Sequence, residues 1–270
     1  MGLSKRLDAA RKGYAGHDAS LSALAHDPAA IARAYSEEPH SRGASKYLGS
    51  MVYGGLDGII TTFAVVSGVV GAELDAGIIL ILGLANLMGD GFSMGVGAYL
   101  SSKSDQEFYA RERERESWEV DHFPQAEWQE LYELYRSQGY VDEDARTMVD
   151  IKFKDRERLV DAMMIEELGL QKDDKKPALE GLVTFLAFVV AGAIPLLLYL
   201  LDLLFPFELG SGTAFLLSLA LSGLALFGLG AAKTLVTQRA PWRSGMEMLL
   251  VGGLAAGVAY AIGALLKGII

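Results

Sequence analysis

The chain has 270 residues, 51% of them hydrophobic and 31 of them glycine, and its mean hydropathy of +0.26 is high for a water-soluble protein. It contains no cysteine, which excludes disulfides, thiolate zinc sites and cysteine nucleophiles. The net charge of −10 comes mostly from residues 102–180, where 22 acidic residues stand against 13 basic ones, and such an acidic segment argues against nucleic acid as a partner.

Residues 1–46 form a polar segment of mixed charge. They contain no apolar stretch followed by a small-residue cleavage site, so we expect no secretory signal. A short helix is expected around residues 28–35, because Asp27 suits the N-cap position and Pro28 the first helical position. We recognise no other motif in this segment.

Five apolar stretches follow, each long enough to cross a bilayer, which takes about 20 apolar residues. Pro195 lies inside the third stretch and predicts a kink there. We therefore expect an all-α membrane protein with five transmembrane helices and, between the second and third, an acidic insert of three helices over residues 102–177. The membrane parts on either side of the insert are residues 47–101 and 178–270. The five stretches are 48–72, 77–100, 181–201, 213–232 and 248–266.

The loops predict an orientation, because lysine and arginine favour the cytoplasmic side of a membrane. Basic residues gather in residues 1–46 and in the loop between the fourth and fifth spans, whereas the loops after the first and third spans contain none. This pattern places residues 1–46 and the insert in the cytoplasm and the C-terminus outside. Lys267 disagrees, but a lysine at a helix end can extend its amine to the membrane interface.

The insert is predicted to be helical throughout. Its first helix continues the second span and stops at Phe123-Pro124. The second helix runs over residues 124–138, where apolar residues recur at helical spacing, and Gly139 ends it. The third helix runs over residues 142–168, and Gly169 after it is a suitable C-cap.

An acidic residue, Asp57, lies inside the first span, where burying a carboxylate is costly and needs a partner. On the second span Asn86, Asp90 and Met94 are four apart and so share one helix face. If the two spans meet here, carboxylates, an amide and a thioether converge. Mixed oxygen and thioether ligands suit a borderline transition metal such as ferrous iron. The alternatives are a carboxylate hydrogen-bonded to threonine or tyrosine, which only fixes helix packing, and a methionine that only packs.

Glutamates in the insert follow the pattern E-x2-E-x7-E-x2-E, in which each pair shares a helix face and the gap spans the Phe123-Pro124 break. The break can fold the two pairs toward each other, and glutamates on facing helices are how helical bundles build cation sites. Acid-rich helices are also often only solvated, so this alternative stays open. The candidate ligands are Glu116, Glu119, Glu127 and Glu130, joined by Met163 and Glu167 from the third helix.

Other polar residues of the insert favour structural roles. Glu112 and Glu114 alternate with arginines in ARERERE, and we interpret them as members of surface ion pairs. His122, the one histidine in the insert, is expected at the surface. A diiron oxidase would need two Glu-x-x-His motifs, and within the insert Glu119 and His122 alone have that spacing. We therefore do not expect an enzyme.

The first two spans carry YGGLDGIITTFAVVSG and GLANLMGDGFSMGVGAYLS, and the insert closes with EELGL. With these motifs the sequence resembles the vacuolar iron transporter family over residues 46–270. The resemblance implies a homodimer that exchanges cytoplasmic ferrous iron, and sometimes manganese, for protons. It implies that Asp57 and Met94 line the translocation path, and that glutamates and Met163 of the insert gather metal. Some members have a glutamate in the second span; this chain has none, and Asp90 is expected to take its role.

The expected function is transport of ferrous iron, or of manganese, out of the cytoplasm in exchange for protons, with no tightly bound cofactor. The expected location is a prokaryotic plasma membrane. The main alternative is a membrane protein that buffers or senses metal without moving it. The expected metal ligands are Asp57, Asp90, Met94, Glu116, Glu119, Glu127, Glu130, Met163 and Glu167.

Overall fold

The computed structural model describes residues 3–29, 31–32, 44–205, 210–237 and 240–267. Every regular element within these residues is a helix, which confirms the expected all-α fold. The chain divides into two compact units, residues 1–46 and residues 47–270.

The first unit contains α1 (Leu3–Ala15) and α2 (Ala19–Ala25), which pack against each other. Asp18 is the N-cap of α2, and its carboxylate accepts a hydrogen bond from the backbone N–H of Ser20 at 2.9 Å. Of the short helix expected around residues 28–35, residues 28–29 and 31–32 are helical, and the remainder lies outside the described residues.

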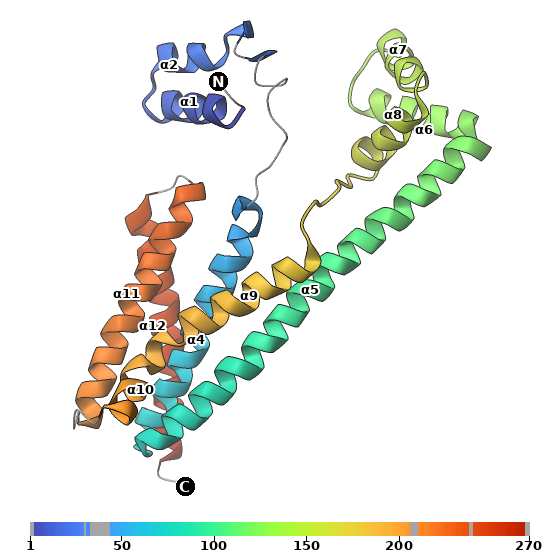
Figure 1. The fold of residues 1–270 in the computed structure, drawn as a ribbon. Helices are drawn as coiled ribbons and strands as arrows, with labels where there is room; N and C mark the ends of the chain where they lie inside the picture. Colours follow the sequence, from blue (N-terminus) through green and yellow to red (C-terminus); the bar gives the residue numbers. More distant parts are fainter. Residues whose placement is uncertain (1–2, 30, 33–43, 206–209, 238–239, 268–270) are drawn as a thin grey trace. The chain divides into compact units, whose positions relative to one another are not determined.

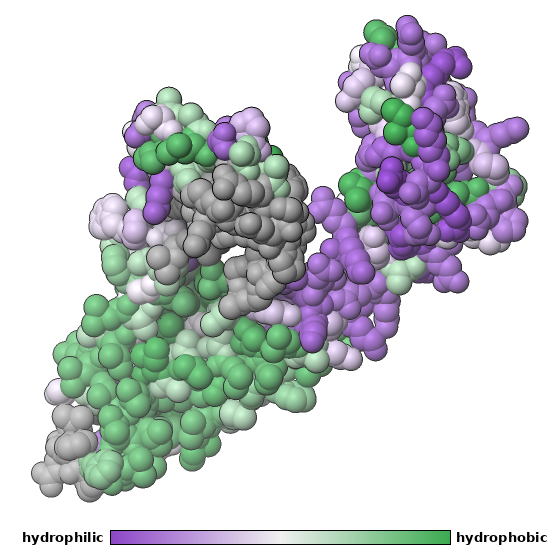
Figure 2. All heavy atoms as spheres, turned by 45° about the horizontal axis from the view of Figure 1, so that its top comes forward, coloured by the Kyte–Doolittle hydropathy of each residue, from purple (hydrophilic) through white to green (hydrophobic). Residues whose placement is uncertain are grey.

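Five helices of the second unit are long and apolar enough to cross a membrane, which confirms the expected spans. Apolar residues predominate on them on the face shown in Figure 2, whereas hydrophilic residues predominate on the insert. The third span is broken into two helices. The spans are α4 (Leu48–Gly71), the first part of α5 (Ala76–His122), α9 with α10 (Pro177–Gly192 and Leu197–Leu204), α11 (Ser211–Thr237) and α12 (Pro241–Leu266).

Helix α5 continues from the second span into the insert without a break, as predicted (Figure 1). Its 47 residues correspond to a length of about 70 Å at the α-helical rise per residue. That is more than twice the roughly 30 Å of a bilayer core. One continuous helix therefore carries both Asp90 in the span and the first glutamates of the insert.

Helix α4 lies at the centre of the membrane part, since α5, α9, α11 and α12 all pack against it. Two glycines let the backbones of α4 and α9 approach closely. A Cβ added at Gly58 would lie 2.3 Å from the carbonyl oxygen of Phe188, and one at Gly54 would lie 2.6 Å from that of Thr184. These contacts fix the rotation of α4, and with it the position of Asp57.

The third span breaks at Pro195, where the sequence predicts a kink. Helix α9 ends at Gly192, a 3₁₀ turn η3 covers Ile194–Leu196, and α10 follows. Proline interrupts a helix because it lacks an N–H and its ring crowds the preceding turn. The hydroxyl of Ser218 in α11 donates a hydrogen bond to the carbonyl oxygen of Pro195 at 2.7 Å, which ties the break to the fourth span.

The insert continues after α5 with α6 (Pro124–Ser137), α7 (Asp142–Lys152), α8 (Arg156–Ala162) and a π-helical turn, η2 (Met163–Glu167). The prediction of one helix over residues 142–168 is wrong, because Asp155 starts a new one. Its carboxylate accepts hydrogen bonds from the backbone N–H groups of Glu157 and Arg158 and so caps α8. Gly139 and Gly169 end their helices as predicted, with φ values of +96° and +67°.

An apolar core holds these elements of the insert together. Val120 of α5, Leu131 and Tyr135 of α6, and Met163 and Met164 of η2 are buried in it. Since α5, α6 and η2 all meet in this core, acidic side chains from three separate segments of sequence are held in one region.

Candidate metal centre

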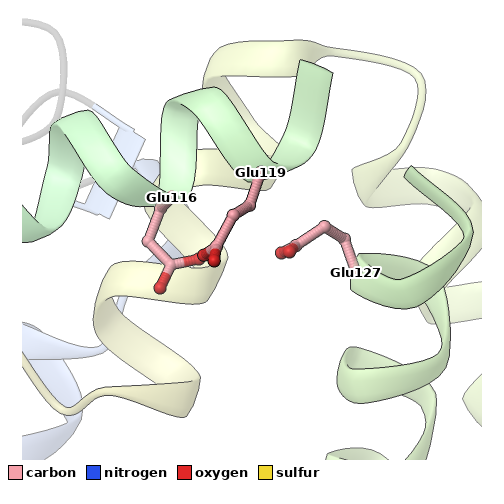
Figure 3. Close-up of side chains that lie close together, drawn as sticks. All are labelled: Glu116, Glu119 and Glu127. Carbon is pink, nitrogen blue, oxygen red and sulfur yellow. The ribbon is translucent and has the colours of Figure 1, made fainter. Parts of the chain in front are cut away.

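Three glutamates meet where α5 ends and α6 begins (Figure 3). Glu116 and Glu119 are three residues apart on α5 and share one of its faces. The chain turns at Phe123 and Pro124, and Glu127 in the first turn of α6 points back toward the two glutamates of α5. One carboxylate oxygen from each residue lies within 4.8 Å of the other two. We call Glu116, Glu119 and Glu127 the glutamate cluster.

Two members of the cluster are buried, with only 2% of Glu116 and 3% of Glu127 exposed. Burial, followed by repulsion from neighbouring glutamates, raises the pKa of Glu127 to about 7. Burial also raises the pKa of Glu116, against the opposing charge of Arg115. The Oε2 atom of Glu127 is buried with no hydrogen-bond partner among the described residues. A buried carboxylate in this state is costly, so a cation or a proton at this point would stabilise the insert.

Glu130 and Glu167 lie at the edge of the cluster. Both are exposed, and neither belongs to the group of three whose oxygens are within 4.8 Å of one another. Their charges nevertheless contribute to the raised pKa of Glu127, so both are near enough to interact with it. The structure thus gathers all five predicted glutamates of the insert in one region, with three in close contact.

The π-helical turn η2 separates the roles of two adjacent glutamates. Glu166 accepts hydrogen bonds from Tyr135 at 2.8 Å and from Lys152 at 2.7 Å, so its charge is already matched. The charge of Glu167 instead acts on the glutamate cluster. Met163, the first residue of the turn, is fully buried in the apolar core of the insert. Turns of this kind are frequent at functional sites because they redirect side chains within a helix.

Arg115 is a member of the site that the sequence pattern did not single out. Its guanidinium donates to Glu116 at 2.5 Å, to Glu119, and to Glu112 at 3.1 Å. Glu112 also pairs with Arg111, as expected for a surface ion pair. The signal was present in the spacing: Arg115 comes three residues after Glu112 and four before Glu119, and side chains at such spacings meet on a helix.

His122 lies at the exposed end of α5, as expected. Its ring stacks on that of Trp118 with 4.2 Å between centroids, and its Nδ1 atom lies 2.8 Å from the carbonyl oxygen of the same residue. These contacts give His122 a local structural role.

In the membrane part, Asp57 of α4 is half-buried and Asp90 of α5 is exposed. The two carboxylates lie close enough to interact through their charges. Neither carboxylate accepts a hydrogen bond from a residue that the structure describes. Thr61, a candidate partner for Asp57, donates to the backbone carbonyl oxygen of that residue at 2.8 Å instead. Among the described residues, the threonine or tyrosine hydrogen bond that the packing alternative requires is not formed with either carboxylate.

Met94 and Asn86 lie one turn on either side of Asp90. Met94 is half-buried against the apolar core of the spans, which is the packing role considered above. Asn86 buries its Nδ2 atom without a hydrogen-bond partner among the described residues. An amide, a carboxylate and a thioether thus follow one another along α5, which packs against α4, the helix that carries Asp57.

Comparison with known families decides which class of membrane protein this is. The family model described as VIT family matches residues 48–264 of the 270. The chain belongs to the VIT family. The match spans all five membrane helices and the insert, so it includes both groups of acidic residues.

Several family members from eukaryotes are similar over most of their length. The vacuolar iron transporter of Toxoplasma gondii is 41% identical over 86% of this chain and 78% of its own. That of Plasmodium falciparum is 36% identical over 98% of both chains. Vacuolar iron transporter 1 of Arabidopsis thaliana is 34% identical over 81% of this chain and 86% of its own. These relatives are named for the vacuole and give no support to the expected prokaryotic plasma membrane.

Proposed function

We propose that this protein carries ferrous iron across a membrane, out of the cytoplasm and in exchange for protons. Its relatives are named as iron transporters, and five apolar helices supply a path. The observation that carries the proposal is the glutamate cluster. It contains a buried carboxylate oxygen without a partner among the described residues, and it begins on the same helix as the intramembrane Asp90.

The insert has the task of collecting metal. Five carboxylates offer oxygen ligands, which divalent cations prefer. The exposed side chains of Glu130 and Glu167 can move toward a cation that Glu116, Glu119 and Glu127 have bound. Met163 is proposed to add a thioether, which favours a transition metal over magnesium or calcium.

Asp57, Asp90 and Met94 form the proposed second stage, inside the membrane. A carboxylate holds either a proton or a metal ion, and binding the metal releases the proton. This competition is the minimum requirement for exchanging one ion for the other. The absence of a fixed partner for either aspartate among the described residues supports the assignment, since such a partner would have to be displaced in every cycle.

The proposal includes a homodimer, with residues 1–46 and the insert in the cytoplasm and the C-terminus outside. The exposed face of α5 supports the dimer: Ser93 and Gly97, three and seven residues after Asp90, share its helix face and are exposed with it, so a second copy could cover all three. Manganese is proposed as a second cargo, because oxygen-rich ligand sets accept both ions.

Purified protein in liposomes that enclose a metal-sensitive dye tests the proposal. Fe²⁺ or Mn²⁺ is added outside without oxygen, with the lumen either acidic or at the external pH. Uptake above that of protein-free liposomes, and faster with an acidic lumen, would support transport and rank the two metals. Metal binding by folded protein without uptake would contradict transport and favour the buffering or sensing alternative.

A further inference from the structure

Arg115 forms hydrogen-bonded ion pairs with two members of the glutamate cluster, Glu116 and Glu119. Its Nη2 atom donates to Oε1 of Glu116 at 2.5 Å and its Nη1 atom donates to Glu119. These are two of the three carboxylates that a bound metal ion would need. A guanidinium is a planar cation that binds carboxylates through several donors at once, so it competes directly with the metal for these oxygens.

The guanidinium does not satisfy the whole cluster. Glu127 is 3% exposed, and its Oε2 atom has no hydrogen-bond partner among the described residues. An oxygen of Glu127 lies within 4.8 Å of oxygens of both Glu116 and Glu119. A single ion placed among the three could contact all of them, which Arg115 does not achieve from its side of the cluster.

Arg115 also has a hydrogen-bond partner outside the cluster, Glu112, to which it can stay bonded when it leaves the cluster. Its Nε atom donates to Oε2 of Glu112 at 3.1 Å, and Glu112 is not a member of the cluster. The side chain of Arg115 is 44% exposed, so rotation toward solvent is not blocked by packing. Moving away from Glu116 and Glu119 therefore need not break the bond to Glu112.

We propose that Arg115 is a built-in competitor that sets the affinity and charge selectivity of the cluster: a divalent cation displaces its guanidinium from Glu116 and Glu119, and the guanidinium stays on Glu112. This inference rests on the proposed function, since it takes the cluster to be the site that collects metal. To the proposed function it adds that Arg115 controls how readily the cluster releases its metal ion. Bound metal leaves more easily when Arg115 returns, because the returning charge replaces the departing one.

The exchange also selects by charge. A monovalent cation brings no more charge than the guanidinium that it would replace, so it gains little from displacing Arg115. A divalent cation brings twice that charge and can reach Glu127 as well. Removing Arg115 should therefore strengthen the binding of divalent ions.

The test is calorimetric titration of Mn²⁺ into the full-length protein in detergent, comparing wild type with Arg115→Gln. We expect Mn²⁺ to bind about tenfold more tightly to R115Q, because the metal no longer has to break charge-assisted hydrogen bonds. Arg115→Lys should give an intermediate affinity, since an ammonium lacks the planar set of donors. Arg158→Gln is the matched control: it removes one positive charge from the insert, at a side chain that is 73% exposed and pairs with Asp155.

Weaker binding by folded R115Q would overturn the inference and make Arg115 an organiser of the carboxylates. An affinity equal to that of R158Q would overturn it too. Glu127→Gln separates this failure from failure of the proposed function. If Mn²⁺ binds equally well to E127Q and to wild type, the cluster is not the site that collects metal. The proposed role of the cluster and the inference about Arg115 are then both wrong. If binding depends on Glu127 but not on Arg115, only the inference about Arg115 falls. Should R115Q not fold, the same comparison is made with R115K.

Discussion

The two groups of acidic residues differ in how their charge is held. In the insert, Glu116 and Glu127 are buried beside an apolar core, and Arg115 forms ion pairs with Glu116 and Glu119. In the membrane, Asp57 and Asp90 act on each other, and neither has an ion pair with a described basic residue. The first group thus contains a positively charged partner, Arg115, for two of its carboxylates. The second group is a pair of carboxylates without a basic partner among the described residues.

This difference favours separate tasks for the two groups. Several converging carboxylates can concentrate a dilute cation, and the degree of protonation of Glu127 tunes how strongly they do so. Two carboxylates in a low-dielectric setting repel strongly unless a proton or a metal ion lies between them. Changes in the insert should therefore alter affinity, and changes in the membrane pair should alter flux.

The largest effect is expected for Asp57→Ala. Metal uptake into liposomes should fall to the level of protein-free vesicles, because the membrane stage loses the ligand that holds either metal or proton. Binding of Mn²⁺ to the insert should remain as in wild type. Glu247→Gln, which alters an exposed acid of α12, is the control and should leave uptake unchanged. Proton-coupled uptake that persists in folded D57A would remove Asp57 from the mechanism.

The next effect is expected for Glu127→Gln. Mn²⁺ affinity should fall by about 10- to 100-fold or more, since even partners of metal ligands contribute that much. Uptake at saturating metal should be largely kept, because the membrane pair is intact. Glu133→Gln changes an exposed glutamate of the same helix and should bind as wild type does. Equal losses in the two variants would show that only the overall charge of α6 matters.

A smaller effect is expected from pH. Because the pKa of Glu127 is raised to about 7, lowering the pH below that value keeps a proton on a metal ligand. Mn²⁺ affinity should then fall by up to about tenfold per pH unit, from competition between one proton and the metal. Calorimetry at pH 7.5, 6.5 and 5.5 measures this. An affinity that does not change over this range would contradict the role of Glu127, and E127Q should show a flatter profile.

The metal-free protein should show the opposite dependence in its stability. A carboxyl whose pKa rises on folding, from 4.5 to about 7 for Glu127, stabilises the fold fully below pH 4.5. This contribution is lost as the pH rises to about 7, since the folded state then has to hold a buried charge. The melting temperature of E127Q should therefore exceed that of wild type by an amount that grows between pH 4.5 and about pH 7 and is then constant. A difference that does not grow over this range would contradict the raised pKa.

The smallest effect on binding is expected for Glu166→Gln. Lys152 and Tyr135 already match the charge of Glu166, so it contributes little field to the cluster. Mn²⁺ affinity should change by less than about threefold, as for an acid already engaged in a partly exposed ion pair. A loss as large as that of E127Q would place Glu166 among the ligands and contradict the division of roles within η2.

The spans could be predicted from the sequence because bilayer thickness sets a length that apolar stretches reveal directly. Pro195 and Gly139 were equally predictable from sequence. Proline restricts the backbone and lacks an N–H, whereas glycine allows the positive φ that ends a helix. The break between α7 and α8 was not, because no glycine or proline marks it. There Asp155 acts through its side chain, and an aspartate can equally well lie on the outside of a continuing helix.

The candidate site was predictable in membership but not in detail. The spacing of Glu116, Glu119, Glu127 and Glu130 treats the two pairs alike, yet Glu127 is buried and Glu130 is exposed. Which member of a pair faces inward depends on how α6 packs on α5, and that is set by the apolar core rather than by the acids. The sequence did not single out Arg115, because it lies in a run of alternating charges and such runs also occur on solvated helices.

One recording tests the central claim of exchange most directly. Liposomes containing the wild-type protein enclose both a metal-sensitive and a pH-sensitive dye, with potassium and valinomycin holding the membrane potential at zero. Fe²⁺ added outside, with equal pH on both sides, should enter while the lumen becomes more alkaline, and neither change should occur with D57A. Metal uptake with no change in luminal pH would contradict the exchange of metal for protons.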